Sequence, residues 1–97
     1  MNSIEHFIDG KVVKGSSKRT GKVFNPATGE VSSNVNLAST ADLDKAVKAA
    51  KKAFKGWSEK TPLFRARVLF KFKELIEKNY DELTKIIVSE HGKVYED

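Results

Sequence analysis

The hydrophobic pattern of this chain changes its period near Ser39, and this change constrains the fold more than any other feature of the sequence. Before Ser39, short apolar runs alternate with turn residues, which is typical of strands. After Ser39, apolar residues recur every three and four positions, which is the spacing of one face of an α-helix. The sequence therefore predicts an α+β chain, with strands and turns in residues 1–38 and helices in residues 39–92.

Two turn signals organise the strand half. Asp9-Gly10 stands between two short apolar runs, and Asp-Gly favours a two-residue type I′ hairpin because both central residues need a positive φ. Residues 25–30 read Asn-Pro-Ala-Thr-Gly-Glu, in which the proline fixes φ and the glycine accepts a positive φ, so a second turn is expected. The segment after it, residues 31–37, has few apolar residues and is predicted as an exposed edge strand or a half-buried strand.

The helical half begins with a single apolar stripe. Its members are Leu43, Ala46, Val47, Ala50, Ala53, Phe54 and Trp57. Ser39 or Thr40 can accept a hydrogen bond from the first free amides, and Asp42 adds a favourable charge to the first turn. The sequence predicts one amphipathic helix over these residues.

Two further helices follow from their end signals. Thr61 is predicted to cap a second helix that begins at Pro62. Asn79 and Glu82 have the spacing of a capping box for a third helix, and Gly92 is a natural stop for it.

The second helix is apolar on more than one narrow stripe. Its apolar residues are Leu63, Phe64, Ala66, Val68, Leu69, Phe70, Phe72, Leu75 and Ile76. Such a helix needs neighbours on two sides, and two short hairpins make a poor sheet on their own. We therefore expect residues 1–97 to be one incomplete segment of a larger domain.

The residues available for chemistry are few. The chain has no cysteine, which excludes a disulfide, a thiolate nucleophile and a cysteine-ligated metal. His6 and His91 fall in different elements, and we interpret them as a strand-end surface residue and a helix C-terminal residue. No glycine-rich phosphate motif occurs, and the acidic pairs Asp42 with Asp44 and Asp81 with Glu82 are predicted first-turn helix charges. We predict no catalytic, cofactor-binding or metal-binding residue.

The net charge of +5 leaves two interpretations open. Five lysines lie opposite the apolar stripe of the first predicted helix, namely Lys45, Lys48, Lys51, Lys52 and Lys55. They fit a solvated face, and no nucleic-acid partner is expected. The alternative is an independent basic module that binds an acidic partner or nucleic acid. No apolar run reaches the length of a membrane span, and the acidic start of the chain does not fit a secretory signal, so a cytoplasmic protein without a membrane partner is expected.

Several motifs, in this order, resemble the aldehyde dehydrogenase family. They are Phe7-Ile8-Asp9-Gly10-Lys11, the Asn-Pro-Ala-Thr-Gly-Glu turn of residues 25–30, Ala53-Phe54-x-x-Trp57, Arg65-x-x-x-Leu69 and Glu90-His91-Gly92-Lys93. The resemblance runs from Phe7 to Asp97. Residues 68–76 and 90–93 are most similar to the CoA-acylating methylmalonate-semialdehyde dehydrogenase branch, with the succinate-semialdehyde and betaine-aldehyde enzymes as alternatives.

The resemblance implies a reaction for a full-length enzyme. In the family a cysteine thiolate adds to an aldehyde, hydride passes to NAD and a thioester remains; in the acylating branch CoA takes the acyl group and carbon dioxide leaves. It also implies that this chain is the outer part of an α/β cofactor domain, whose partner is the missing remainder of a dimeric or tetrameric enzyme. The chain ends before the family's cofactor loops and catalytic cysteine, so we expect it to bind neither NAD nor CoA and to be inactive alone.

Overall fold

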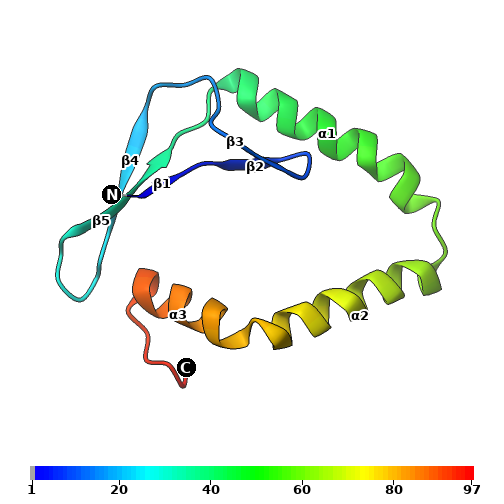
Figure 1. Cartoon of the computed structure of the whole chain (residues 1–97). Coiled ribbons are helices and arrows are strands. Elements are labelled where there is room, and N and C mark those ends of the chain that lie inside the picture. Colours follow the sequence, from blue (N-terminus) through cyan, green and yellow to red (C-terminus); the bar gives the residue numbers. More distant parts are fainter. Residues whose placement is uncertain (1) are drawn as a thin grey trace.

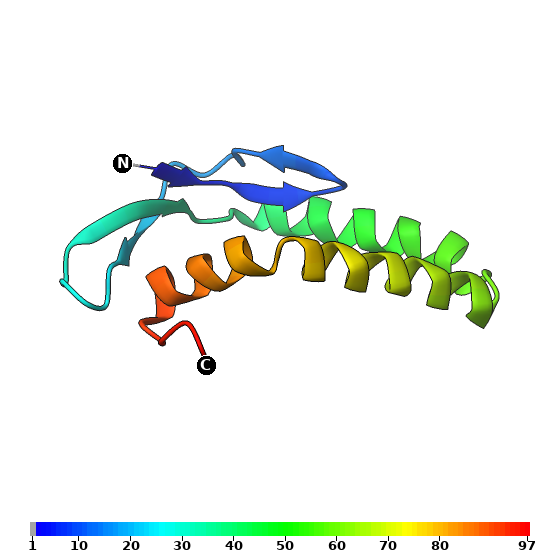
Figure 2. The same cartoon turned by 60° about the horizontal axis from the view of Figure 1, so that its bottom comes forward.

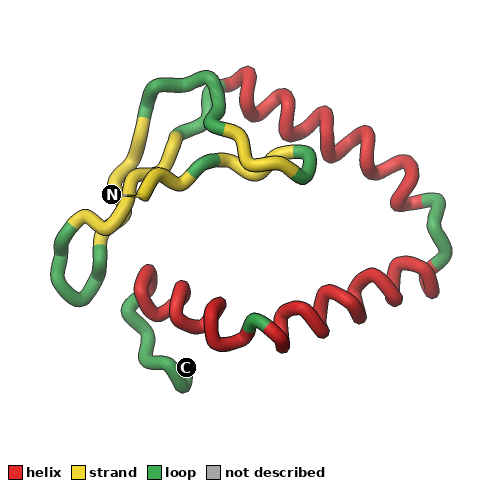
Figure 3. Tube along the Cα trace, viewed as in Figure 1, coloured by secondary structure: helices red, strands yellow, loops and turns green. Residues whose placement is uncertain are grey.

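A computed structural model describes residues 2–97 and contains strands followed by helices (Figures 1 and 3). The strands are β1 (Asn2–Ile4), β2 (His6–Ile8), β3 (Lys11–Val13), β4 (Thr20–Phe24) and β5 (Val31–Asn36). The helices are α1 (Thr40–Ser58), α2 (Pro62–Lys78) and α3 (Tyr80–His91). The predicted α+β class, with strands and turns first and three helices after them, is confirmed.

The hairpin of β2 and β3 forms as its turn residues predict. The strands are antiparallel, with Ile8 opposite Lys11. Asp9 and Gly10 have φ values of 54° and 73°, which is the pair of positive angles that a type I′ turn requires. The hairpin lies against the alanine side of α1, where Ala46 and Ala49 are half-buried (Figure 2).

The second sheet has three strands in the order β1-β5-β4. The strand β5 is antiparallel to β4 and parallel to β1, so it is the central strand, and the edge-strand prediction for residues 31–37 is wrong. Its half-buried alternative is right. The sequence did not indicate β1 as a strand, because only one of its three residues is apolar and all three are exposed. Its pairing with β5 is made through the backbone, which leaves no hydrophobic pattern in the sequence.

Local end signals fix the helix boundaries. The side chain of Ser39 accepts a hydrogen bond from the Asp42 amide at the start of α1, and that of Thr61 accepts one from the Phe64 amide at the start of α2. At the end of α3, Gly92 has a φ of 83° and its amide donates to the carbonyl of Val88. These three end signals are confirmed.

The predicted capping box of Asn79 with Glu82 is wrong. Asn79 makes no side-chain cap to α3, and its Nδ2 instead donates to the Leu75 carbonyl at 2.7 Å. Asn79 is the single residue between α2 and α3, and its φ of −106° and ψ of 20° depart from the extended conformation of a capping residue. The side chain therefore satisfies the end of the preceding helix instead of the start of the next.

The elements form an open arc one layer thick (Figures 1 and 2). Its extents are 48 × 38 × 15 Å, and its radius of gyration is 17.2 Å, whereas a compact domain of this length has about 12.5 Å. No hydrophobic residue among residues 2–97 is buried, and the most open side chains include Phe7 at 75% and Phe70 at 68% exposure. A domain buries its apolar faces between at least two layers of secondary structure. The described residues form a single layer, so their apolar faces stay open.

We predict that the isolated 97-residue chain is helical but only marginally stable. Ordering the backbone costs on the order of 1–2 kcal/mol per residue, and burial of apolar side chains offsets little of that cost here. The chain should bind a hydrophobic dye, self-associate or melt without cooperativity, and its strands should exchange amide protons fastest. Circular dichroism, dye fluorescence and hydrogen exchange measure this. A sharp two-state melt of a monomer, with slow exchange in β2 and β3, would show that the prediction is wrong.

Candidate functional site

The Asp42 carboxylate is the most connected polar group of the chain. One oxygen accepts hydrogen bonds from the Ser39 amide and the Ser39 hydroxyl, both at 2.9 Å. The amide of Ser16 donates to both oxygens at 3.1 Å, and the two serine hydroxyls lie 2.7 Å apart. Asp42 is 4% exposed. This Asp42 clip, made of Ser16, Ser39 and Asp42, joins the loop after β3 to the start of α1.

The same contacts set the charge state of Asp42. The backbone amide of Ser39 is the largest influence, and with the amide of Ser16 it holds the pKa of this carboxyl well below its usual range. A carboxylate that already accepts several hydrogen bonds is a poor proton acceptor. The first-turn role predicted for Asp42 is confirmed, and the geometry indicates a structural clip and no general base.

His6 lies closer to the clip than the sequence indicates. A Cβ atom at Gly15 would come within 2.9 Å of His6 Nε2 and 3.0 Å of an Asp42 oxygen, so Gly15 permits the close approach of all three residues. His6 is half-buried, and its Nε2 is covered by protein without a hydrogen-bond partner among the described residues. His6 is the first residue of β2, as the strand-end interpretation expects, but its side chain is half-buried and does not lie on the open surface. Gly15, with a φ of 83°, is the one local signal of this contact.

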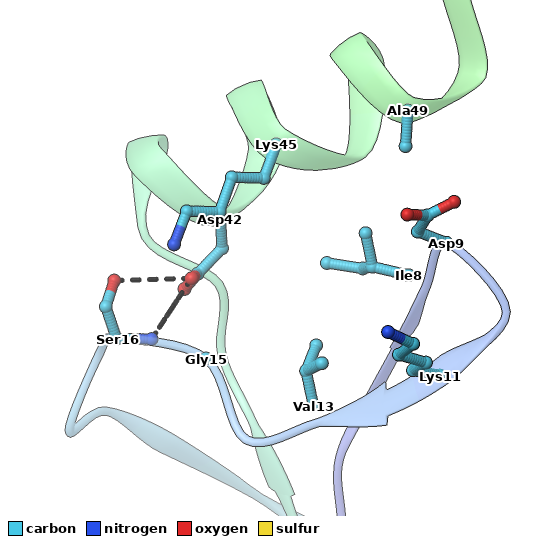
Figure 4. Close-up of a pocket in the computed structure, with 9 residues that line it drawn as sticks. All are labelled: Ile8, Asp9, Lys11, Val13, Gly15, Ser16, Asp42, Lys45 and Ala49. Atoms are coloured by element: carbon cyan, nitrogen blue, oxygen red, sulfur yellow. Dashed lines mark hydrogen bonds between the residues drawn. The ribbon is translucent and has the colours of Figure 1, made fainter. Parts of the chain in front are cut away.

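A cavity of about 460 Å³ lies between the β2–β3 hairpin and the first turns of α1 (Figure 4). Ile8, Val13 and Ala49 form its apolar part, and Asp9, Lys11, Gly15, Ser16, Asp42 and Lys45 complete the lining. Figure 4 shows the Asp42 carboxylate turned toward Ser16. The one hydroxyl of the lining, that of Ser16, donates to Asp42 Oδ1 at 3.3 Å and lies 2.7 Å from the Ser39 hydroxyl, so it belongs to the Asp42 clip.

Two sequence motifs that are far apart along the chain meet in space. In the turn of residues 25–30, the Asn25 amide donates to the Glu30 carbonyl at 2.8 Å, and the Gly29 amide donates to the Asn25 carbonyl at 2.7 Å. This turn lies against the end of α3, because a Cβ atom at Gly92 would be 3.0 Å from Pro26 Cγ. Gly92 is therefore required both by its φ of 83° and by the approach of the proline ring.

The lysines of α1 are exposed, as the solvated-face interpretation expects. Lys45, Lys48, Lys51, Lys52 and Lys55 make no ion pair with any other described residue. The ion pairs present, Lys71 with Glu74 at 3.3 Å and Lys73 with Glu77 at 2.5 Å, are both on the surface of α2. Such exposed pairs contribute little to stability.

The described residues bring no further group of reactive side chains together. His91 ends α3 and lies apart from β2, which carries His6. Within residues 2–97 no group of three or more His, Cys, Asp or Glu side chains is placed to hold a metal ion. No helix in the same range is long and apolar enough to cross a membrane. The expectation that the chain has no catalytic, cofactor-binding or metal-binding residue stays a prediction.

Comparison with known sequences gives one consistent family. The model of the aldehyde dehydrogenase family matches residues 12–97. A malonate-semialdehyde dehydrogenase from Halalkalibacterium halodurans is 45% identical over 95 residues, which are 97% of this chain and 19% of that protein. One from Pseudomonas aeruginosa is 43% identical over 97 residues, covering 100% of this chain and 19% of the relative. The chain thus spans about a fifth of the length of these relatives.

Solved structures agree in backbone as well as sequence. A structure from Sinorhizobium meliloti with NAD, described as a methylmalonate-semialdehyde dehydrogenase, is 49% identical with a TM-score of 0.96, covering 100% of this chain and 20% of that one. The methylmalonate-semialdehyde dehydrogenase of Oceanimonas doudoroffii is 46% identical with a TM-score of 0.93, covering 99% and 20%. The match of the family model over most of the chain, together with these structures, shows that the chain belongs to the aldehyde dehydrogenase family.

Proposed function

We propose that this chain is the amino-terminal segment of an NAD-dependent aldehyde dehydrogenase that oxidises malonate semialdehyde or methylmalonate semialdehyde to an acyl-CoA with release of carbon dioxide. One observation carries the proposal. Relatives named for these two substrates match the chain over nearly its whole length, at 43–49% identity. The benzaldehyde dehydrogenase among the structural neighbours is 30% identical over a similar span.

In this proposal residues 1–97 form the outer part of the cofactor domain, with strands and turns in residues 1–38 and helices in residues 39–92. The chain would act as a frame and would contribute no reacting group. The proposed enzyme is a cytoplasmic homo-oligomer, a dimer or a tetramer, as the family resemblance implies. The sequence match along the whole of this chain supports its place in such an enzyme.

The residues of this chain do not fit the pyrophosphate of NAD or CoA. Dinucleotide phosphates bind at helix N-termini that follow a glycine-rich turn. At α1 the Asp42 amide already donates to the Ser39 hydroxyl, and the Asp42 carboxylate would repel a phosphate. At α2 the first residue is a proline, and α3 has Asp81 and Glu82 in its first turn. We therefore assign both cofactors to other parts of the proposed enzyme.

The reading frame after the codon for Asp97 tests the substrate assignment. We expect it to continue into a glycine-rich segment and a cysteine, and the encoded protein to form NADH and acyl-CoA from methylmalonate semialdehyde. Absorbance of NADH with and without CoA is the measurement. A frame without such residues, or a purified product that oxidises benzaldehyde and leaves both semialdehydes untouched, would contradict the proposal.

The 97-residue chain alone should produce no NADH from either semialdehyde. Covalent aldehyde oxidation needs a thiol, and the chain has none. Hydride transfer also needs a bound nicotinamide held against the substrate. The control is the full-length relative assayed at the same molar concentration. Turnover by the purified chain that persists through a second purification from a host lacking its own enzyme would refute this prediction.

The Asp42 clip should depend on pH on the acid side. Its folded-state pKa is depressed, so its contribution to stability is complete above the unfolded value of about 3.9 and is lost as the pH falls below that value toward the folded one. We expect the Ser16 and Ser39 amide resonances to stay unchanged through about pH 4 and to shift together only well below it, as Asp42 takes up its proton in the folded state. Asp42→Asn should show the loosened state already at neutral pH, and Asp44→Asn should behave like the unchanged chain. Identical titrations of all three chains would exclude the clip.

A further inference from the structure

Seven of the nine apolar residues of α2 fall on two unequal sides of the helix. At 3.6 residues per turn, Phe64, Val68, Phe72, Leu75 and Ile76 share one side with Arg65. We call these six residues the α2 docking face. Its apolar members are between 39% and 59% exposed, so the described residues leave the face largely open. On the other side, Leu63 and Phe70 stand among charged residues, including the ion pair of Lys73 with Glu77.

Arg65 is the one charged residue of the α2 docking face, and its side chain needs a hydrogen-bond acceptor. The residue is half-buried, and its Nε is covered by protein without a hydrogen-bond acceptor among the described residues. A covered guanidinium donor without an acceptor is costly, whereas one paired with a carboxylate or carbonyl oxygen is favourable. The face therefore suits a partner that is mostly apolar and brings one oxygen acceptor to Arg65.

The face continues into the elbow between α2 and α3. Phe72, Leu75 and Ile76 line a groove of about 290 Å³ together with Leu83 and Ile86 of α3. Leu83 and Ile86 are 41% and 51% exposed. An apolar groove that opens beside an apolar helix face makes one continuous surface, and surfaces of this kind mark interaction sites.

We propose that the α2 docking face and this elbow groove bind the other four fifths of an aldehyde dehydrogenase subunit, which supplies a carboxylate or carbonyl oxygen to Arg65 Nε. This inference rests on the proposed function. The solved relatives keep the backbone of this chain at TM-scores of 0.96 and 0.93 while it covers only 20% of each. The backbone that presents the face is thus preserved within chains about five times as long.

Two charged surfaces of the helices are poor sites for this partner. The lysines of α1 carry unpaired charge, and burying them without partners would be costly. On the second side of α2, Leu63 and Phe70 are flanked by Arg67, Lys73, Glu74 and Glu77, which suits contact with water. Docking through the face that contains Arg65 therefore leaves both charged surfaces in solvent.

A chimera tests the assignment in a full-length enzyme. This chain replaces the matching fifth of the Oceanimonas doudoroffii enzyme, and hydrogen exchange is measured for α2 in the chimera and in the 97-residue chain. We expect exchange of α2 to be about 100-fold slower in the chimera. Arg65→Met should speed that exchange about tenfold, and Arg65→Lys should recover only part of the loss because lysine lacks the planar fork. Arg67→Met, the matched control on the opposite side, should change nothing.

Four outcomes would overturn the assignment of the α2 docking face, and a fifth would bear on the proposed function alone. The assignment is wrong if the amides of α2 exchange equally fast in both proteins, or if Arg67→Met speeds that exchange as much as Arg65→Met does. It is also wrong if the chimera does not fold. If the 97-residue chain dimerises and protects α2 as well as the chimera does, the occupant is a second copy. A chimera with a protected α2 that oxidises neither semialdehyde would count against the proposed function and leave the docking face intact.

Discussion

The carboxylate of Asp42 joins the two halves of this chain. It accepts hydrogen bonds from Ser16, in the loop after β3, and from Ser39, at the start of α1. Asn36 extends this polar connection, since its Nδ2 donates to the Lys14 carbonyl at 3.1 Å. Because no described hydrophobic residue is buried, the orientation of the hairpin relative to α1 and β5 depends on these hydrogen bonds more than it would in a domain with an apolar core.

This dependence has a structural reason. The small side chains of Ala46 and Ala49 let the hairpin approach α1 closely, so little apolar area is covered there. The larger residues Val47 and Phe54, 49% and 67% exposed, lie on a neighbouring side of the helix and stay open. Capping and turn geometry therefore set where each element begins and ends. The burial of apolar side chains, which normally supplies most of the stability of a domain, is not provided by contacts among the described residues.

The sequence predicted the features that depend on neighbouring residues. The type I′ turn at Asp9-Gly10, the caps at Ser39 and Thr61 and the stop at Gly92 all follow from short-range stereochemistry. The failures concern choices made in three dimensions. The β1 strand pairs through its backbone with β5, and the paired residues lie 31 positions apart along the chain. The side chain of Asn79 had two helix ends within reach. The contact of Asp42 with Ser16 spans 26 positions, which no local pattern encodes.

Two of the motifs that resemble the family also make a contact between residues that are distant in the sequence. Pro26 and Gly92 belong to separate motifs, yet the proline ring occupies the space that a side chain at position 92 would need. Each motif therefore restricts the other. Residues that set backbone geometry can identify a family as firmly as catalytic residues do. When two such residues are in contact, as Pro26 and Gly92 are, a change at either one must be accommodated by its partner. This is why a chain without a thiol still carries a clear family identity, while the reaction itself has to be inferred from its relatives.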